Sequence, residues 1–414
     1  MPFSRTFVWI VLFSFMLSGS FFAPARSAGQ GQLSEKAFRN VFKMLKAQSP
    51  NQQLTDAELY LGAIEGMLKA AAHKDIREYN QVLQGDAYQE IKISSSGKLA
   101  GIGAILKVGS SQSVSKGLGS ETELIISQAA PLMVMDVFEG SPAQKAGLQP
   151  QDVVLAIDKD QTDGMSFRQA IYALRGVPGS KVNVVVLRGS QTKKIPITRG
   201  NIVFPTMHKQ ILNNKIGYLA ISAFTQRSAN EAVEIFKEFK QNNIRGLVLD
   251  LRDNGGGSLE QVIAIAENLL DSDQVIATIM KRKSQVTHQG KQRLFGNIPT
   301  VVLVNGRTAS GAEMLSRALQ ENDLALLVGE DTFGKNSVEK VEEISKNVAI
   351  KYTIARWVSP RKLNQSQRGI QPDIPVSMDE KLWQSLRFKK NMNERLQKDV
   401  QLRVAYQTLL FKID

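Results

Sequence analysis

Cysteine is absent from this chain of 414 residues. Its absence excludes disulfide scaffolds, thiolate-bound zinc or iron–sulfur sites and a cysteine nucleophile. Histidine is also scarce, because only His73, His208 and His288 are present. A metal centre built from histidine is therefore not expected, and the sequence indicates no cofactor.

Long apolar runs are scarce as well, and the longest lies close to the N-terminus. Residues 7–22 are apolar apart from small Ser and Gly residues; Arg5 precedes them, and the small residues Ala23 and Ala25 follow. A run of about 16 residues is shorter than the ~20 that a helix needs to cross a bilayer. We therefore predict a cleaved signal peptide over residues 1–28 and export to the periplasm or another compartment outside the cytoplasm. An uncleaved N-terminal membrane anchor is the alternative.

Positive charge is in excess: 52 Lys and Arg residues stand against 39 Asp and Glu residues, which gives a formal charge of +13. The basic residues are spread along the chain and mixed with acidic ones, and no basic run is interleaved with aromatic residues for base stacking. Nucleic-acid binding is therefore not expected. A cationic surface also favours contact with anionic lipid head groups, so association with a membrane surface stays open.

The rest of the chain divides into four regions by pattern. Residues 29–91 show helical spacing of apolar residues and predict a helical arm. Residues 92–202 are richer in Gly and Ser and contain short β-like runs, which predict a small β-rich domain. Residues 203–377 alternate between strand and helix patterns, and residues 378–414 form a polar helical tail.

The alternating region predicts an α/β core with a largely parallel sheet and helices packed on it. Strands are expected over residues 215–221, 246–251, 300–304 and 324–328, and helices over residues 229–241, 259–270 and 309–319.

Two loops at expected strand ends carry residues suited to chemistry, because sites in α/β sheets gather at the C-terminal ends of strands. The loop 252–257 ends in three glycines, which can direct several backbone N–H groups to one side as an anion-binding nest. A tight strand-to-helix turn is the alternative interpretation. Ser310 stands at the expected start of a helix, where free N–H groups can hold an oxyanion. A helix cap is the alternative for Ser310, and Glu313 in the first turn suits the helix dipole.

A serine nucleophile needs a base, and Lys335 is the best candidate. His208 and His288 lack the strand-end context of a catalytic triad. Lys335 follows the expected strand 324–328, which should neighbour the strand that leads to Ser310, so both residues should project from the same sheet edge. A lysine can accept a proton if burial keeps it neutral, whereas a solvated loop lysine is the alternative.

A phosphate-binding loop is a competing interpretation of residues 329–335, which follow a strand and match most of that motif. Asn336 stands where the motif needs Ser or Thr, and a strand rather than a helix is expected to follow. Nucleotide binding is therefore not expected.

Taken together, these segments resemble those of the C-terminal processing peptidases, also called tail-specific proteases. The matching segments, in order, are residues 101–103, 139–152, 250–257, 305–313, 332–335 and 369–374. Each segment is weak alone, but their order and spacing are specific. The resemblance implies a serine endopeptidase with a serine–lysine dyad on a ClpP/crotonase-like core, with an inserted PDZ domain at residues 92–202.

The resemblance also implies roles for individual residues. Ser310 matches the family nucleophile and Lys335 the general base. The backbone N–H of Gly256 or Gly257, with that of Ser310 or its neighbour, matches the oxyanion hole.

Substrate binding follows from the same resemblance. Gly101, Ile102 and Gly103 match the loop that binds a substrate's terminal carboxylate, so proteins or peptides with exposed, apolar C-termini are the expected partners. An adaptor protein and self-association through the terminal helices are left open.

One departure from the family pattern bears on activity. The family usually places Gln four residues after the lysine to orient its amine, and here this position is Glu339. A carboxylate beside an amine favours the protonated amine, which cannot act as a base. A proteolytically inactive PDZ protein that binds peptides on the same fold is therefore the alternative function. A hydrophilic insertion over residues 109–123 is a second departure.

Overall fold

The computed structural model describes residues 33–413 apart from 97, 110–123, 204, 295, 363–367 and 388–390. The predicted signal peptide and most of the 109–123 insertion lie outside these residues. In the described ranges no helix has the length and apolar character to cross a membrane. The same ranges hold no group of three His, Asp or Glu side chains placed to bind a metal ion.

The chain forms two compact units, with the boundary after Met67. The first unit contains α1 (Glu35–Gln48) and most of α2 (Asp56–Ala71). Phe42 and Tyr60 stack between these helices at a ring-centroid distance of 4.8 Å. Thr55 and Glu58 form a capping box at the start of α2, in which each backbone N–H donates to the other's side chain.

The second unit begins with 3₁₀-helix η1 (Lys74–Tyr79), strand β1 (Gln81–Gln84) and helix α3 (Gly85–Ser96). The sequence predicts a helical arm over residues 29–91, but residues 81–84 are extended because they pair with a later strand, β18 (Val348–Val358). This long-range pairing overrides the local helical pattern.

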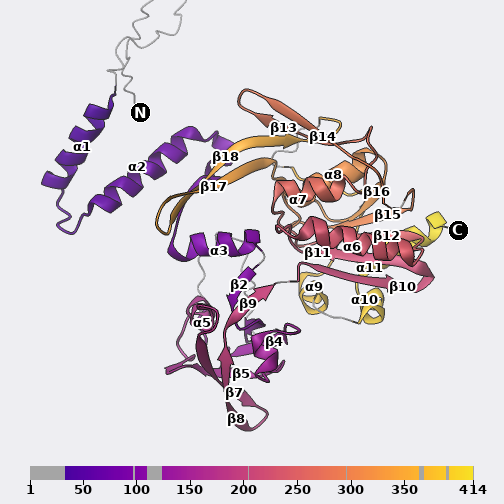
Figure 1. Cartoon of the computed structure of the whole chain (residues 1–414), viewed down its shortest axis with the longest axis horizontal. Helices are drawn as coiled ribbons and strands as arrows, with labels where there is room; N and C mark the ends of the chain where they lie inside the picture. Colours follow the sequence, from indigo (N-terminus) through magenta and orange to yellow (C-terminus); the bar gives the residue numbers. More distant parts are fainter. Residues whose placement is uncertain are drawn as a thin grey trace, which may run out of the picture. The chain divides into compact units, whose positions relative to one another are not determined.

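An antiparallel sheet forms the β-rich domain (Figure 1), with strands in the order β3, β4, β5, β7 and β8, and with β6 paired to β5. Alternate residues of β7, among them Val182, Val184 and Val186, are fully buried, which is the period of two expected for a strand with one face on a core. β3 pairs only with β4 and is therefore an edge strand in the described part of the domain. The elements are β2 (Lys98–Gly101), β3 (Ala104–Val108), β4 (Leu132–Val137), α4 (Pro142–Lys145), β5 (Val153–Ile157), β6 (Asp160–Gln161), α5 (Phe167–Leu174), β7 (Lys181–Arg188), β8 (Gln191–Thr198) and β9 (Gly200–Val203).

The expected α/β core is confirmed, with one largely parallel sheet in the order β10, β11, β12, β15, β16 and β19. The pairs from β11 to β19 are parallel, and only β10 runs antiparallel. The expected strands agree with the observed ones to within a residue or two. The strands are β10 (Met207–Leu212), β11 (Ile216–Ile221), β12 (Gly246–Asp250), β15 (Thr300–Val304), β16 (Ala325–Gly329) and β19 (Ile374–Pro375), and η2 (Asn213–Lys215) precedes β11.

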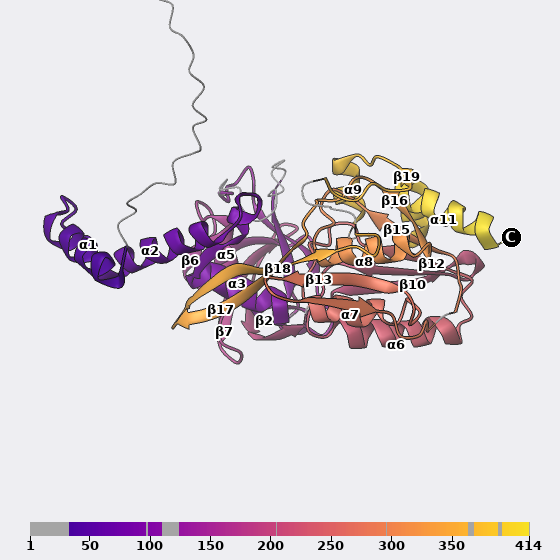
Figure 2. The same ribbon diagram turned by 90° about the horizontal axis from the view of Figure 1, so that it is seen from above.

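Helices cover both faces of this sheet (Figure 2). One face packs against α6 (Ser228–Gln241), α7 (Leu259–Ala266) and α8 (Gly311–Glu321), and the other packs against α10 (Met392–Lys398) and α11 (Val400–Ile413). Every residue of β12 is buried, as expected for a parallel strand covered on both sides. α9 (Glu380–Leu386) completes the helical tail.

A second sheet of the core is antiparallel and was not expected from the sequence. It joins β1, β18, β13 (Val275–Lys281) and β14 (Gln285–Gln289), with β17 (Ser337–Ser345) on the other edge of β18. β17 starts two residues after Lys335, so this sheet fixes the direction in which the chain leaves the lysine.

Candidate active site

Ser310 lies in the loop between β15 and α8 in a strained backbone conformation. Its φ is 55° and its ψ is −116°, a combination that costs a non-glycine residue about 1–3 kcal/mol. A sharp strand-to-helix turn of this kind exposes a nucleophile above a sheet edge in other hydrolases. It also leaves the first N–H groups of the helix outside the helical hydrogen-bond ladder. The strain therefore favours a chemical role for Ser310 over a simple helix cap.

Gly256 lies against this turn, whereas its neighbour Gly257 packs on the backbone of Phe224. Gly256 has a φ of +99°, and a Cβ added to it would lie 2.9 Å from the Cβ of Ser310, so only glycine fits here. Its N–H already donates to Asn254 Oδ1 at 2.8 Å. Gly311 is the first residue of α8, and its N lies 3.0 Å from the same added Cβ position. The backbone nitrogen of Gly311 thus lies next to the glycine loop.

Glu313 connects Ser310 to the loop that carries Lys335. Its Oε2 accepts hydrogen bonds from the backbone N–H of Ser310 at 2.8 Å and of Lys335 at 2.9 Å. Its Oε1 accepts from the Thr332 hydroxyl at 2.5 Å and from the N–H of Gly334 at 2.7 Å. Since β15 and β16 are parallel neighbours, both loops leave the same sheet edge, and one buried carboxylate holds them together.

Burial raises the pKa of Glu313, although its four hydrogen-bond donors act in the opposite direction. All four partners donate, so an ionised carboxylate, which only accepts, fits this position best. The sequence interpretation of Glu313 as a dipole-compensating residue missed this second role. The Ser-x-x-Glu spacing of a capping box was the available signal.

Lys335 is engaged by Glu339, as the sequence hypothesis on Glu339 required. The Nζ of Lys335 lies 2.7 Å from Glu339 Oε2, and the two side chains are only 17% and 12% exposed. Glu339 Oε1 accepts from the Ser337 hydroxyl at 2.5 Å. Among the described hydrogen bonds, none joins the Lys335 amine to the Ser310 hydroxyl. The structure thus brings the loops of Ser310 and Lys335 together, while the Lys335 amine itself pairs with Glu339.

The ring of Tyr79 covers the lysine from η1, with its centroid 4.7 Å from the Lys335 Nζ. Burial raises the pKa of Tyr79 to about 12, and the charges of Glu78 and Glu339 contribute in the same direction. Tyr79 therefore stays neutral near pH 7 and offers its π-face to the ammonium group.

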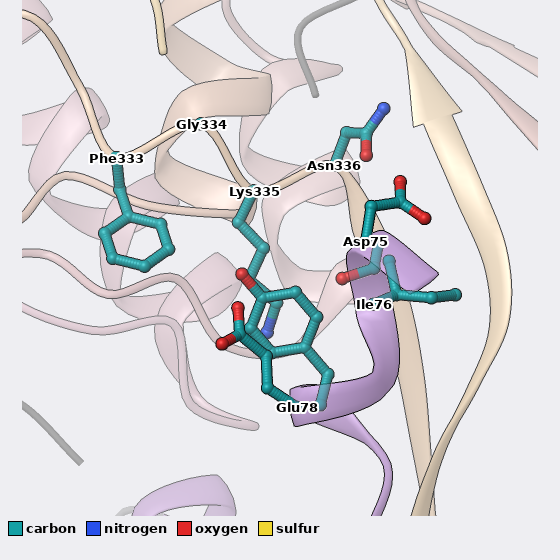
Figure 3. A pocket seen from close by; sticks show the side chains of 9 residues that line it. Asp75, Ile76, Glu78, Phe333, Gly334, Lys335 and Asn336 are labelled. Atoms are coloured by element: carbon teal, nitrogen blue, oxygen red, sulfur yellow. The ribbon is translucent and has the colours of Figure 1, made fainter. Parts of the chain in front are cut away.

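A cavity of about 210 Å³ adjoins Lys335, between η1 and the loop that leads into β17 (Figure 3). η1 is held in place by an ion pair between Asp75 and Arg356 at 2.6 Å and by Asn80, which accepts hydrogen bonds from Thr353. The sequence predicts only a helical arm for η1, and no local motif marks it as part of a site. The lining residues are Asp75, Ile76, Glu78, Tyr79, Phe333, Gly334, Lys335, Asn336 and Ser337.

A buried cluster of charges supports the glycine loop from the other side. Arg252 donates to both carboxylate oxygens of Asp250 and of Asp399 at 2.7–2.9 Å and to Gln401 at 2.9 Å. Its guanidinium also lies 4.0 Å from the ring centroid of Trp383. Arg252 thereby joins the end of β12 to the C-terminal helices, which sequence analysis did not foresee.

The predicted carboxylate-binding loop leads into the edge strand β3. Gly103 has a φ of +81°, and the Ile102 side chain is buried. The carbonyl of Ile102 accepts from Ala143 N–H at 2.8 Å, and that of Gly103 accepts from Phe138 N–H at 3.0 Å. The loop is thus anchored through its carbonyls, and among the described strands β4 is the one that pairs with β3.

Comparison with known proteins gives consistent matches. Residues 215–376 match peptidase family S41, and residues 133–188 match the PDZ domain. The chain is 27% identical to carboxy-terminal processing protease CtpA of Bacillus subtilis over 366 residues, which covers 88% of this chain and 73% of that protein. It is 29% identical to a carboxyl-terminal-processing protease of Synechocystis over 357 residues, with 85% and 79% covered.

A solved structure from Bacteroides fragilis, named for family S41, has a similar fold. Its TM-score is 0.57 at 17% identity, and the match covers 90% of this chain and 97% of that one. At this identity the likeness supports the fold alone.

Proposed function

Because the chain belongs to the C-terminal processing peptidases of family S41 and carries a PDZ domain, we propose that it cleaves peptide bonds with Ser310 as nucleophile and Lys335 as general base. The observation that carries the proposal is the Glu313 carboxylate, which accepts hydrogen bonds from the backbone of both residues. The strained conformation of Ser310 supports the same assignment.

In this reaction the neutral Lys335 amine accepts the hydroxyl proton of Ser310 as the oxygen attacks the substrate carbonyl. The N–H groups of Gly257 and Gly311 are the donors we assign to the oxyanion, because those of Gly256 and Ser310 already have acceptors. The protonated lysine then gives its proton to the leaving amine, and water releases the acyl group. Lys335 must leave Glu339 before the first step.

We also propose that the PDZ domain binds the free carboxyl terminus of substrates with apolar tails. The N–H groups of the loop Gly101 to Gly103 would meet the carboxylate, and the tail would pair with the edge strand β3. We assign the core to the ClpP/crotonase-like class. Export through a cleaved signal peptide at residues 1–28, to the periplasm or a similar compartment, completes the proposal.

The alternative function is a peptide-binding PDZ protein without proteolytic activity. The Lys335–Glu339 ion pair favours it, because a lysine held as an ammonium cannot take a proton.

A peptide substrate with a free C-terminal carboxylate tests this function. We expect the full chain to cleave a peptide with an apolar C-terminal tail at least tenfold faster, in kcat/KM, than the same peptide with an amidated terminus. Cleavage and its position are followed by mass spectrometry. Equal rates would contradict tail recognition by the PDZ domain, whereas binding of the free-acid peptide without any cleavage between pH 5 and 9 would favour the alternative.

Replacing Glu339 by glutamine should raise activity. The change keeps the hydrogen bond to Lys335 but removes the charge that favours its ammonium form, so the acid limb of the kcat/KM profile should move down by about one pH unit. At neutral pH this corresponds to about a tenfold gain. Glu342→Gln is the matched control, because Glu342 lies on the opposite face of β17 and bonds Tyr352 and Lys340. An unchanged profile in Glu339→Gln would show that the ion pair does not control the base.

A further inference from the structure

A second lysine, Lys351, lies on the same face of the antiparallel sheet as Glu339. In the pairing of β17 with β18, Glu339 faces Thr353, and Val341 faces Lys351. Since side chains two residues apart on a strand share a face, Glu339 and Lys351 are diagonal neighbours on it. Diagonal neighbours lie within about 7–8 Å at their backbones, which long side chains can span.

Lys351 is half-buried, and the described ion pairs give it no carboxylate partner. Burial lowers the pKa of Lys351, the nearby charge of Lys335 lowers it further, and Glu339 acts in the opposite direction. Two amines therefore compete for one carboxylate. Because one carboxylate cannot compensate two ammonium groups in a part-buried site, one of the two lysines is disfavoured as a cation.

The other charged groups around Lys335 and Lys351 already have partners or are neutral. Arg356 is already neutralised by Asp75. Glu313 accepts four hydrogen bonds, and Tyr79 is neutral. Glu78 also lines the cavity, but it is exposed to solvent. Glu339 is thus the part-buried carboxylate that lies within reach of both lysines.

We propose that Lys351 is a positioning residue for the peptidase reaction, whose ammonium group takes over the Glu339 carboxylate and thereby frees the Lys335 amine for Ser310. In the observed arrangement Glu339 holds Lys335. When Glu339 pairs with Lys351, the carboxylate favours the ammonium form of Lys351, and Lys335 loses its counter-ion beside that charge, so its excess proton passes to solvent. The neutral amine can then accept the proton of Ser310. The inference rests on the proposed function for its catalytic consequence but not for the exchange of partners.

Lys351→Met tests the exchange through the pH profile. Without the second ammonium group, Glu339 holds Lys335 permanently, so the acid limb of kcat/KM should move up by about one pH unit, and activity at pH 7 should fall about tenfold. Lys351→Arg keeps the positive charge and should restore the profile. In the Glu339→Gln background, Lys351→Met should change kcat/KM less than threefold, because no carboxylate remains to be exchanged.

A second measurement does not need peptidase activity. Trace acetylation of the Ser310→Ala chain at pH 8 reports the fraction of neutral amine at each lysine, with exposed Lys340 as internal reference. The Lys335 to Lys340 labelling ratio should fall about tenfold in Lys351→Met and recover in Lys351→Arg. Lys351→Gln replaces Lys351→Met if that variant unfolds.

Two results would overturn the inference: a Lys335 labelling ratio that is the same with and without Lys351, or a Lys351→Arg variant as impaired as Lys351→Met in a folded chain. If the wild-type chain cleaves no tailed peptide but the lysines show the expected labelling pattern, the proposed function is rejected. The exchange of Glu339 between Lys335 and Lys351 is then still supported.

Discussion

Ser310→Ala is expected to lower kcat/KM for a tailed peptide by at least about ten-thousand-fold, since removal of a nucleophile leaves only binding and oxyanion stabilisation. Lys335→Met should cause a similar loss, because no other amine or imidazole replaces the base. The two residues act as a unit, so the double variant should be no less active than either single one. Steady-state cleavage by mass spectrometry measures all three.

Matched variants separate chemistry from folding in this experiment. Ser316→Ala makes the same change within α8, where the Ser316 hydroxyl donates to the Ala312 carbonyl, and it should retain cleavage. Lys340→Met removes an exposed lysine of β17 and should also be active. Thermal unfolding of Ser310→Ala should match that of the wild type, because its backbone hydrogen bond to Glu313 remains. Near-normal turnover by Lys335→Met would eliminate the dyad.

Arg252→Met should have the largest effect on stability. The guanidinium is fully buried between Asp250 and Asp399. Its removal leaves two buried carboxylates whose remaining cationic neighbour, among the described residues, is Arg395 at 3.5 and 3.6 Å. Removing one partner of a buried ion pair costs about 3–5 kcal/mol. Urea unfolding at pH 7 measures the change. Arg227→Met removes a partly exposed pair with Glu231 and should cost less than about 1 kcal/mol.

The destabilisation by Arg252→Met should depend on pH. Burial acts to raise the pKa of Asp250, but the charge and hydrogen bonds of Arg252 outweigh it, so this pKa lies below its usual value of 3.8. In the wild type the stability that Asp250 contributes is therefore present above pH 3.8 and is lost only as pH falls through the lower native pKa. In the variant the charge of Arg395 and the hydrogen bond from Tyr218 still oppose burial, but without Arg252 the pKa of Asp250 is higher than in the wild type. Protonation therefore relieves the buried charge at a higher pH, so the difference between the two chains should be smaller at pH 4.5 than at pH 7. An equal difference at both values would mean that the loss comes from packing rather than charge.

The sequence was sufficient for the parts of the molecule that local pattern determines. The buried strands before Gly256 and Ser310 follow from apolar runs bounded by glycine and polar residues. Their parallel pairing places the glycine loop, Ser310 and Lys335 at one sheet edge, as predicted. The contact between Lys335 and Glu339 was foreseen only because the family pattern has glutamine at that position.

The remaining features depend on contacts between residues far apart in the chain. Tyr79 lies over Lys335 because β1 pairs with β18, and Arg252 meets Asp399 because α11 returns to the sheet. Neither pairing has a local signature. Glu313 had a signature, the capping box, but its bonds to the lysine loop form only after β15 and β16 align.

The position of η1 limits how the catalytic part of this protein can be excised. The family match begins at residue 215, yet one wall of the cavity beside Lys335 is supplied by residues 75–79, and the support of the glycine loop comes from residues 399 and 401. A fragment cut at the limits of the match would lose the edge strand β10, the Tyr79 ring over Lys335 and Asp399, one of the two carboxylates that pair with Arg252. The smallest piece that keeps these contacts therefore extends well beyond the matched segment at both ends and includes the inserted domain.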